Sequence, residues 1–152
     1  MPLFLSPRYP DTRHKAEYHP SPNWLRENNR NPAMAEAIEF TNIPIFEKEC
    51  KRMPRFVLHE LAHAYHHQVL GWDHPQIRDA YQAAKKAGTY NAVKNHAGHP
   101  RTAYALTPET DDFADNTEAF FGANDFYPFN KQQLKKHDPN IHNLLKKIWL
   151  EK

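Results

Sequence analysis

The sequence predicts an α+β domain that is mostly helical and carries a small edge sheet. Its 152 residues fit one domain. Apolar residues recur at helical spacing in several stretches that open near a proline and end at a glycine. Short runs at residues 41–46 and 101–106 have the composition of strands. We therefore expect one domain over residues 1–152, in which the proline-rich residues 1–24 form an extended N-terminal arm.

The first half of the chain is expected to hold two helices and one strand. Asn31-Pro32 pairs an N-cap residue with proline at the first helical position, which predicts a short helix to about Phe40. Residues 41–46 read as a strand that Pro44 would restrict to a sheet edge. The clearest helix runs over residues 54–70 and stops at Gly71. Its expected apolar stripe consists of Phe56, Leu61, Ala64, Tyr65 and Val69.

The second half is expected to be mainly helical. His74-Pro75 begins a helix that ends near Gly88. Residues 89–106 read as a hairpin or two short strands around Gly98. A further helix runs from Pro108 to Gly122, and residues 130–137 and 139–150 form one or two terminal helices.

Composition excludes some classes of partner. The net charge of +2 is too small to favour nucleic acid or an anionic membrane. The single cysteine, Cys50, excludes an internal disulfide framework. No stretch has the length of a membrane span or the pattern of a signal peptide. The compartment stays open, either cytoplasmic or secreted after processing, as does the oligomeric state.

A metal-binding motif lies in the helix over residues 54–70. In the run His59-Glu60-Leu61-Ala62-His63, the two histidines are four residues apart and share one helix face. Two imidazoles so placed bind one Zn²⁺, and Glu60 lies beside the metal, where its carboxylate takes a proton from a metal-bound water. The alternative interpretation is a surface histidine cluster that holds no metal. His66 and His67 are expected at the surface or behind the ligands.

A catalytic zinc has three protein ligands, so a third is needed from another element. The helix after Pro108 presents Asp111, Asp115 and Glu118 at i, i+4 and i+7, which form one acidic face. Carboxylates stacked in this way repel one another unless a cation lies in front of them. The other interpretation of this face is that it is simply solvated.

These motifs together resemble the gluzincin clan of metallopeptidases, in which an HExxH helix is followed by an acidic helix. The stretch from Tyr104 to Asp115 is most similar to the anthrax lethal factor-like catalytic domains, which have a tyrosine seven residues before the carboxylate ligand of an E-x-F-A-E run. Here Tyr104 stands seven residues before Asp111, in D-D-F-A-D. Uncharacterised bacterial and fungal proteins resemble the chain in the HELAHAYHHQVLG and TEAFFGANDFYPF runs.

The resemblance implies a zincin-like fold and a role for each matching residue. Asp111 would be the third zinc ligand, and Asp115 would orient a histidine ligand from behind. Tyr104 would donate to the oxyanion of the tetrahedral intermediate, unless it is a core or hairpin tyrosine. This chain departs from the pattern by having aspartate at position 111, one methylene shorter than glutamate. If the helix does not approach closely enough, Asp115 or Glu118 becomes the ligand.

The implied function is that of a zinc-dependent metalloendopeptidase acting on a peptide or protein substrate. Three alternatives remain: a zinc-binding module without peptidase activity, another metallohydrolase such as an amidase, and a metal-free interaction protein. The histidine and carboxylate donors favour zinc over other divalent metals.

Overall fold

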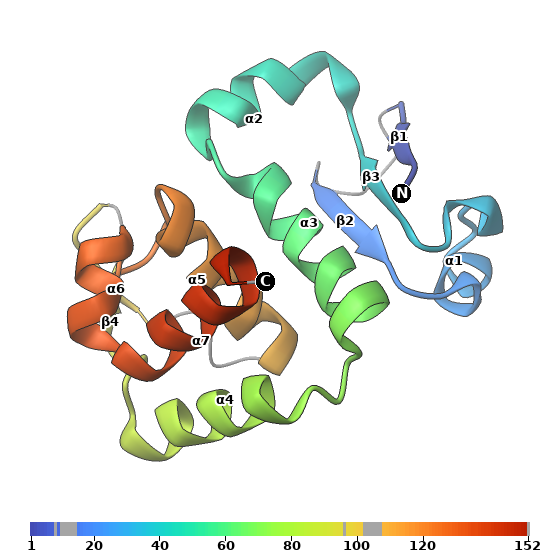
Figure 1. The fold of residues 1–152 in the computed structure, drawn as a ribbon. Helices are drawn as coiled ribbons and strands as arrows, with labels where there is room; N and C mark the ends of the chain where they lie inside the picture. The colour runs from blue at the N-terminus through green and yellow to red at the C-terminus, as the bar shows by residue number, and fades with distance from the viewer. Residues whose placement is uncertain (8, 10–14, 96, 102–107, 152) are drawn as a thin grey trace.

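A computed structural model describes residues 1–7, 9, 15–95, 97–101 and 108–151. These residues form an α+β structure, mostly helical, with one three-stranded sheet and a second, two-stranded pairing. Figure 1 shows the central helix α3 between the three-stranded sheet on one side and the C-terminal helices on the other. This position lets α3 face the sheet and α5 at the same time.

The N-terminal residues build the sheet. Strands β1 (Leu3–Leu5) and β2 (Ala16–His19) flank β3 (Ala37–Phe40) in the order β1-β3-β2. β1 runs parallel to β3, and β2 runs antiparallel to it. Residues 1–24, expected as an arm laid over the domain, thus supply two of the three strands and the start of α1 (Pro22–Glu27).

Two expectations for residues 31–46 are wrong. The cap at Asn31 starts only the 3₁₀ turn η1 (Pro32–Met34), and the chain then enters β3 instead of continuing as a helix to Phe40. Burial decides this, because Ile38 and Phe40 pack into a cluster with Ala64 of α3. The strand expected at 41–46 is instead the 3₁₀ turn η2 (Ile43–Ile45), which leads into α2 (Phe46–Arg52).

The helix over residues 54–70 is confirmed as α3 (Phe56–Tyr65), continued by the π-helical segment η3 (His66–Leu70). Gly71 ends it with φ of 84°, a left-handed value that glycine adopts at little cost. Its buried face differs from the expected stripe: Ala62 and Ala64 are buried, whereas Leu61 and Val69 are 40% and 63% exposed. Small residues are favoured on the buried positions because α3 packs closely against both the sheet and α5.

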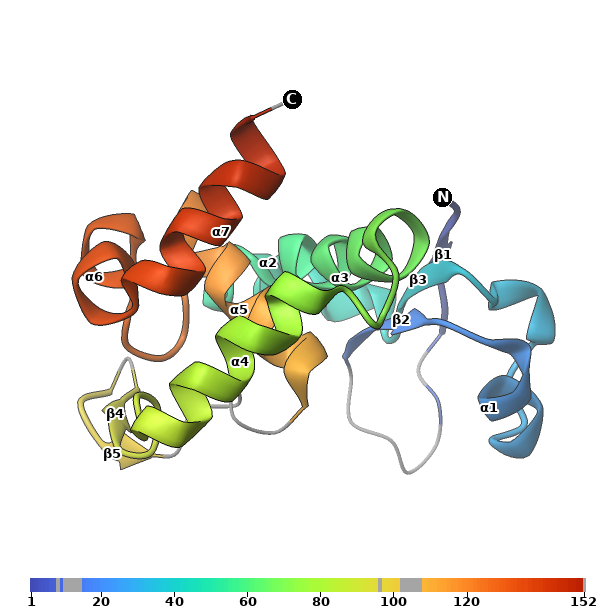
Figure 2. The ribbon, with the colours of Figure 1, turned by 60° about the horizontal axis from the view of Figure 1, so that its bottom comes forward.

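The helices of the second half agree with expectation, and so does a pairing of two short strands, although residues 102–106 of the strand run expected at 101–106 lie outside the described residues. The elements of this half are α4 (Pro75–Ala87), β4 (Val93–Lys94), β5 (Pro100–Arg101), α5 (Glu109–Phe121), α6 (Lys131–His137) and α7 (Pro139–Leu150). β4 and β5 pair antiparallel, as a hairpin requires. Figure 2 shows α4 passing in front of α5 and below α7. Their shared core includes Ile77 of α4, Phe113 of α5 and Leu145 of α7, all with 0% exposure.

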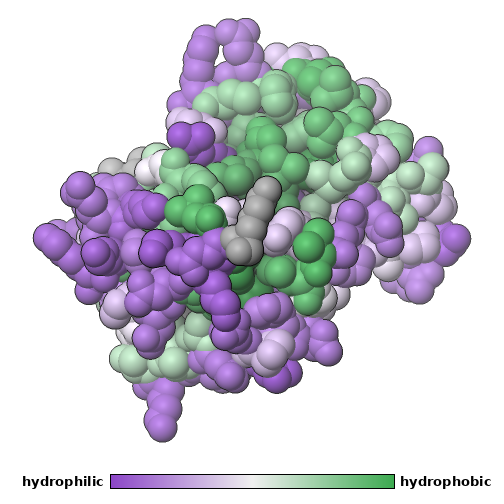
Figure 3. Space-filling view, in the orientation of Figure 1, coloured by the Kyte–Doolittle hydropathy of each residue, from purple (hydrophilic) through white to green (hydrophobic). Residues whose placement is uncertain are grey.

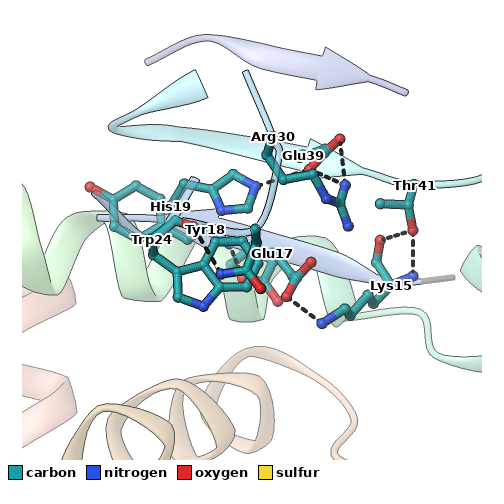
Figure 4. Close-up of polar contacts among 10 residues, drawn as sticks. Lys15, Glu17, Tyr18, His19, Trp24, Arg30, Glu39 and Thr41 are labelled. Carbon is teal, nitrogen blue, oxygen red and sulfur yellow. Dashed lines mark hydrogen bonds and ion pairs between the residues drawn. The ribbon is translucent and has the colours of Figure 1, made fainter. Parts of the chain in front are cut away.

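A buried charged group stabilises the face of the sheet that does not carry the apolar cluster with α3. Glu39 of β3 is fully buried, and its carboxylate lies 3.0 Å from His19 Nε2 and 3.2 Å from Arg30 Nη1 (Figure 4). Tyr9 Oη donates to it at 2.7 Å. These partners compensate the negative charge of the buried Glu39 carboxylate. We therefore interpret this cluster as a structural element that stabilises the sheet.

Figure 3 shows hydrophobic residues gathered at the upper right and centre of this face, and hydrophilic residues over most of its left and lower parts. None of the helices in the described part of the chain combines the length and apolar character needed to cross a bilayer.

Candidate metal centre

Three donor atoms meet where α3 and α5 pack together. Nε2 of His59 and Nε2 of His63 lie 3.0 Å apart, as their spacing of one helical turn predicts. Oδ1 of Asp111, in the first turn of α5, lies 3.3 Å from the His63 nitrogen and 3.8 Å from the His59 nitrogen. The structure therefore brings together the three residues that the sequence nominates as ligands.

These distances fit a zinc ion. A triangle with sides of 3.0, 3.3 and 3.8 Å has a centre about 2.0 Å from each corner, and zinc bonds to imidazole nitrogen and carboxylate oxygen are about 2.0–2.2 Å long. The shorter aspartate side chain is thus long enough, because α5 approaches α3 closely here. The second face of the same histidine offers another grouping of donors, His59 with Asp115 and Glu118.

Two carboxylates lie behind His59. Its Nδ1 is 2.8 Å from Oε1 of Glu118 and 3.3 Å from Oδ1 of Asp115. Both residues are at least nine-tenths buried. A ring whose Nδ1 proton is held in this way presents the lone pair of Nε2 to a metal. The sequence expectation gave this role to Asp115, and the structure places Glu118 closer to the ring.

The close packing of histidines and carboxylates shifts the pKa values of the cluster. Burial lowers the pKa of His59, but hydrogen bonds with Asp111, Asp115 and Glu118 raise it well above the ordinary value. Burial raises the pKa of Asp111, and His59 and His63 outweigh that effect and hold it below its usual range. Burial raises the pKa of Glu118, and the nearby Asp115 and Asp125 raise it further. A protonated His59 supplies a positive charge that a bound Zn²⁺ would supply in its place.

Glu60 faces the same site and is held by the sheet. Its Oε2 accepts a hydrogen bond of 2.7 Å from the backbone N–H of Tyr18 in β2. Glu60 lines the cleft together with His59 and Asp111. One carboxylate oxygen is therefore fixed by the sheet.

A cleft of about 810 Å³ opens over the site, within the range typical of ligand-binding pockets. Among the described residues that line it, the acidic ones outnumber Lys15 and Arg52; they are Glu17, Glu49, Glu60, Asp111, Asp115, Glu118 and Asp125. Both basic residues are paired within the cleft, Lys15 with Glu17 and Arg52 with Glu49. Phe40, Phe46 and Phe56 form an apolar wall, with ring centroids 5.1 to 5.7 Å apart. The excess of carboxylates favours a cation in the cleft.

Other residues fall where the sequence did not place them. Tyr104, expected to contact the oxyanion, lies outside the described residues. His66 was expected at the surface or behind the ligands; it is fully buried, in ring contact with Trp72 and Phe113, so the first of these two expectations is wrong. His67 forms a hydrogen bond with Tyr18. The sequence did not predict this contact, because two residues 49 positions apart leave no local pattern.

Comparisons of the chain with protein families, with curated proteins and with solved structures find no match. The functional argument therefore rests on the site itself.

Proposed function

We propose that the protein is a zinc-dependent metallopeptidase with a zincin-like active site, in which His59, His63 and Asp111 hold Zn²⁺. The observation that carries the proposal is the triangle of His59 Nε2, His63 Nε2 and Asp111 Oδ1, with sides of 3.0 to 3.8 Å. Three protein ligands leave one coordination position open, as in catalytic rather than structural zinc sites. The wide cleft over the triangle supports the same distinction.

The chain supplies a general base beside this triangle. A bound zinc would lower the pKa of a water ligand and polarise a substrate carbonyl. Glu60 would take the proton from that water and pass it to the leaving amine. The Tyr18 amide holds Oε2 of Glu60, so Oε1 is the oxygen that we assign to proton transfer. Glu118 and Asp115 would keep the Nδ1 proton on His59 throughout.

An open strand edge supports a peptide as the substrate. β2 is an edge strand and packs against α3. Thr41 N–H donates to the Lys15 carbonyl on the β3 side, so the alternation of a strand turns the backbone of Ala16 towards the open edge. A peptide could pair there by strand addition. Of the two runs that the sequence predicted as strands, 41–46 is not a strand, and only Arg101 of 101–106 is described.

The test is hydrolysis of a peptide library by the zinc-loaded protein, followed by mass spectrometry, with Glu60→Gln and Glu47→Gln as matched variants. Glu47 is exposed on α2 and is not among the residues that line the cleft. Its ion pair in the described part of the chain is with Lys51. We expect Glu60→Gln to lose at least about 100-fold in turnover while it retains zinc, and Glu47→Gln to stay at the wild-type rate. Undiminished hydrolysis by Glu60→Gln contradicts the assignment. A wild type that binds zinc but cleaves no peptide would instead indicate a zinc-binding module or another metallohydrolase.

A further inference from the structure

Tyr18 forms hydrogen bonds with α3 and with its continuation η3 at two separate points. Its backbone N–H donates to Oε2 of Glu60 at 2.7 Å. Its phenolic oxygen lies 2.7 Å from Nδ1 of His67 and accepts from Nε2 of Gln68 at 3.1 Å. Glu60 and His67 are seven residues apart, which places them two turns apart on one side of a helix. A single residue of β2 therefore spans two helical turns.

The phenol has a complete set of hydrogen bonds. Because the Gln68 amide donates to the phenolic oxygen, the hydroxyl proton is available for Nδ1 of His67, whose own proton then resides on Nε2. Burial raises the pKa of Tyr18, so the hydroxyl keeps this proton at neutral pH. The ring of His67 stacks on Trp72, with centroids 5.0 Å apart and planes at 20°. The acceptor for the hydroxyl is thus itself held in place.

The π-helical segment carries both partners of the phenol. His67 and Gln68 lie within η3 (His66–Leu70). Such segments are rare and are frequently found at functional sites. Gln68 also donates to the backbone carbonyl of Glu36 at 3.2 Å, just before β3, so it joins the same segment to the sheet a second time.

We infer that Tyr18 is a positioning residue for Glu60: its phenol, anchored by His67 and Gln68, keeps the backbone N–H of β2 against one oxygen of the general base. The inference rests on the proposed function and adds to it a remote anchor, since His67 and Gln68 lie two turns from Glu60. Without the anchor, β2 leaves α3 more often, and the Glu60 carboxylate loses its fixed orientation. The metal ligands belong to α3 and α5 and keep their places.

The first test uses amide hydrogen exchange by NMR on the zinc-loaded protein. Tyr18→Phe removes only the hydroxyl, and His67→Phe keeps a ring on Trp72 while it removes the acceptor. Tyr65→Phe is the matched control, since Tyr65 is on α3 but packs against Trp149 of α7. We expect the amide of residue 18 to exchange about tenfold faster in the first two variants, the factor for losing a hydrogen bond of ordinary strength. It should be unchanged in Tyr65→Phe.

The amide of Ile38 in β3 serves as an internal reference. It donates to the Pro2 carbonyl in the same sheet, so a general loss of stability would accelerate it as well. Faster exchange at residue 18 with a constant rate at Ile38 supports the anchor. An unchanged rate at residue 18 in both Tyr18→Phe and His67→Phe overturns it, whether or not the protein cleaves peptides.

The second test is kinetic. On any peptide that the wild type cleaves, Tyr18→Phe and His67→Phe should lower kcat by about tenfold at constant KM, with zinc content at the wild-type level. Unchanged kcat in both variants, despite faster exchange at residue 18, would overturn the positioning role. If the wild type cleaves nothing, the proposed function fails, and the exchange measurement still decides whether the phenol anchors the strand to Glu60.

Discussion

His59 of α3 contacts a histidine of its own helix and carboxylates of α5. One ring nitrogen belongs to the candidate zinc triangle, and the other is bonded to carboxylates of α5. A carboxylate behind a histidine ligand fixes the tautomer and raises the basicity of the coordinating nitrogen. The acidic face of α5 therefore contacts both ring nitrogens of His59. Asp111 lies on the Nε2 side, where the metal would bind, and Glu118 lies at Nδ1.

Replacing the carboxylates behind His59 should weaken zinc binding. We expect Glu118→Gln to raise the zinc Kd by about 10- to 100-fold, and Asp115→Asn to raise it less, because Asp115 lies 3.3 Å from Nδ1 and Glu118 lies 2.8 Å from it. Competition with a chromophoric chelator measures both constants. Glu47→Gln, on the exposed side of α2, is the control. A larger effect for Asp115→Asn would assign the orienting role to Asp115 instead.

His66 should make the fold sensitive to acid. Burial, together with the neighbouring His63, His74 and His67, lowers its pKa to about 4. Its ring nitrogens have no hydrogen-bond partner among the described residues. Between pH 6.5 and 4 the unfolded chain binds a proton that the folded chain does not, so stability falls as the pH falls through this window and levels off below it.

The size of this effect is about 3 kcal/mol at most, from a shift of about 2.5 pKa units. Denaturant unfolding of the wild type and of His66→Leu at pH 7 and pH 4 isolates the contribution of His66. The contributions of the other titratable groups cancel when the pH-dependent stability changes of the two proteins are subtracted. The variant should lose less stability than the wild type between the two pH values. Equal losses would show that His66 is protonated in the folded state.

At the scale of elements, α5 is unusual in burying a row of polar side chains. Asn116 donates to the side chain and the backbone carbonyl of Asp112 at 3.1 and 2.8 Å and accepts from Tyr90 at 3.0 Å. Burial raises the pKa of Asp112 well above its ordinary value, and the nearby Asp138 raises it further. The network lies on the helix that carries Asp111 and limits how that helix can rotate.

The caps of the C-terminal helices offer a direct check on element stability. The side chain of Asn130 accepts from the backbone N–H groups of Gln132 and Gln133, both at 3.1 Å. Asn130→Ala should lower the free energy of unfolding by about 1 kcal/mol. Asn130→Asp, which keeps an acceptor at the same position, should stay near the wild type. Chemical denaturation distinguishes the two, and equal stability of all three proteins would mean that α6 does not depend on this cap.

The sequence predicts the elements whose signals are local. Proline starts and glycine stops define α4 and α5, and helical spacing defines α3. A small sheet was expected, but its three strands were not located, because they pair residues far apart in the chain, such as Leu3 with Ile38. Helix α2 was missed although it carries the local pairs Glu47 with Lys51 and Glu49 with Arg52. Its local signal was present, and no element was expected over residues 47–53.

The candidate site likewise contains residues that the sequence predicts and contacts that it does not. His59, Glu60 and His63 follow from spacing on one helix, and Asp111 follows from a resemblance to a known motif. The bonds from Tyr18 to Glu60 and His67 depend on how β2 lies against α3, which no local pattern encodes. The closer approach of Glu118 than Asp115 to His59 depends on the angle and distance between two helices, to within less than 1 Å.

At the scale of the whole molecule, α3 connects two parts of the structure (Figure 1). It packs against β2 and β3 on one side and against α5 on the other. The candidate zinc triangle lies in the second of these contacts and takes ligands from both helices. A bound ion would therefore cross-link the two parts.

Zinc should accordingly stabilise the fold. At free zinc of 100 times the Kd, the free energy of unfolding should rise by about 2.7 kcal/mol, and chelator should remove the gain. His63→Ala should abolish the response to zinc without loss of the helices. Thermal unfolding with and without zinc measures this. A melting temperature that zinc leaves unchanged in the wild type would contradict binding at the α3–α5 contact.

The most direct test of the central claim is the zinc content of the purified protein and of Asp111→Ala by elemental analysis. We predict about one zinc per chain in the wild type and little in the variant, because three ligands from two helices form the site. Full retention in Asp111→Ala would move the third ligand to Asp115 or Glu118. A wild type that holds no zinc, even after reconstitution, would contradict the metal centre and with it the proposed enzyme.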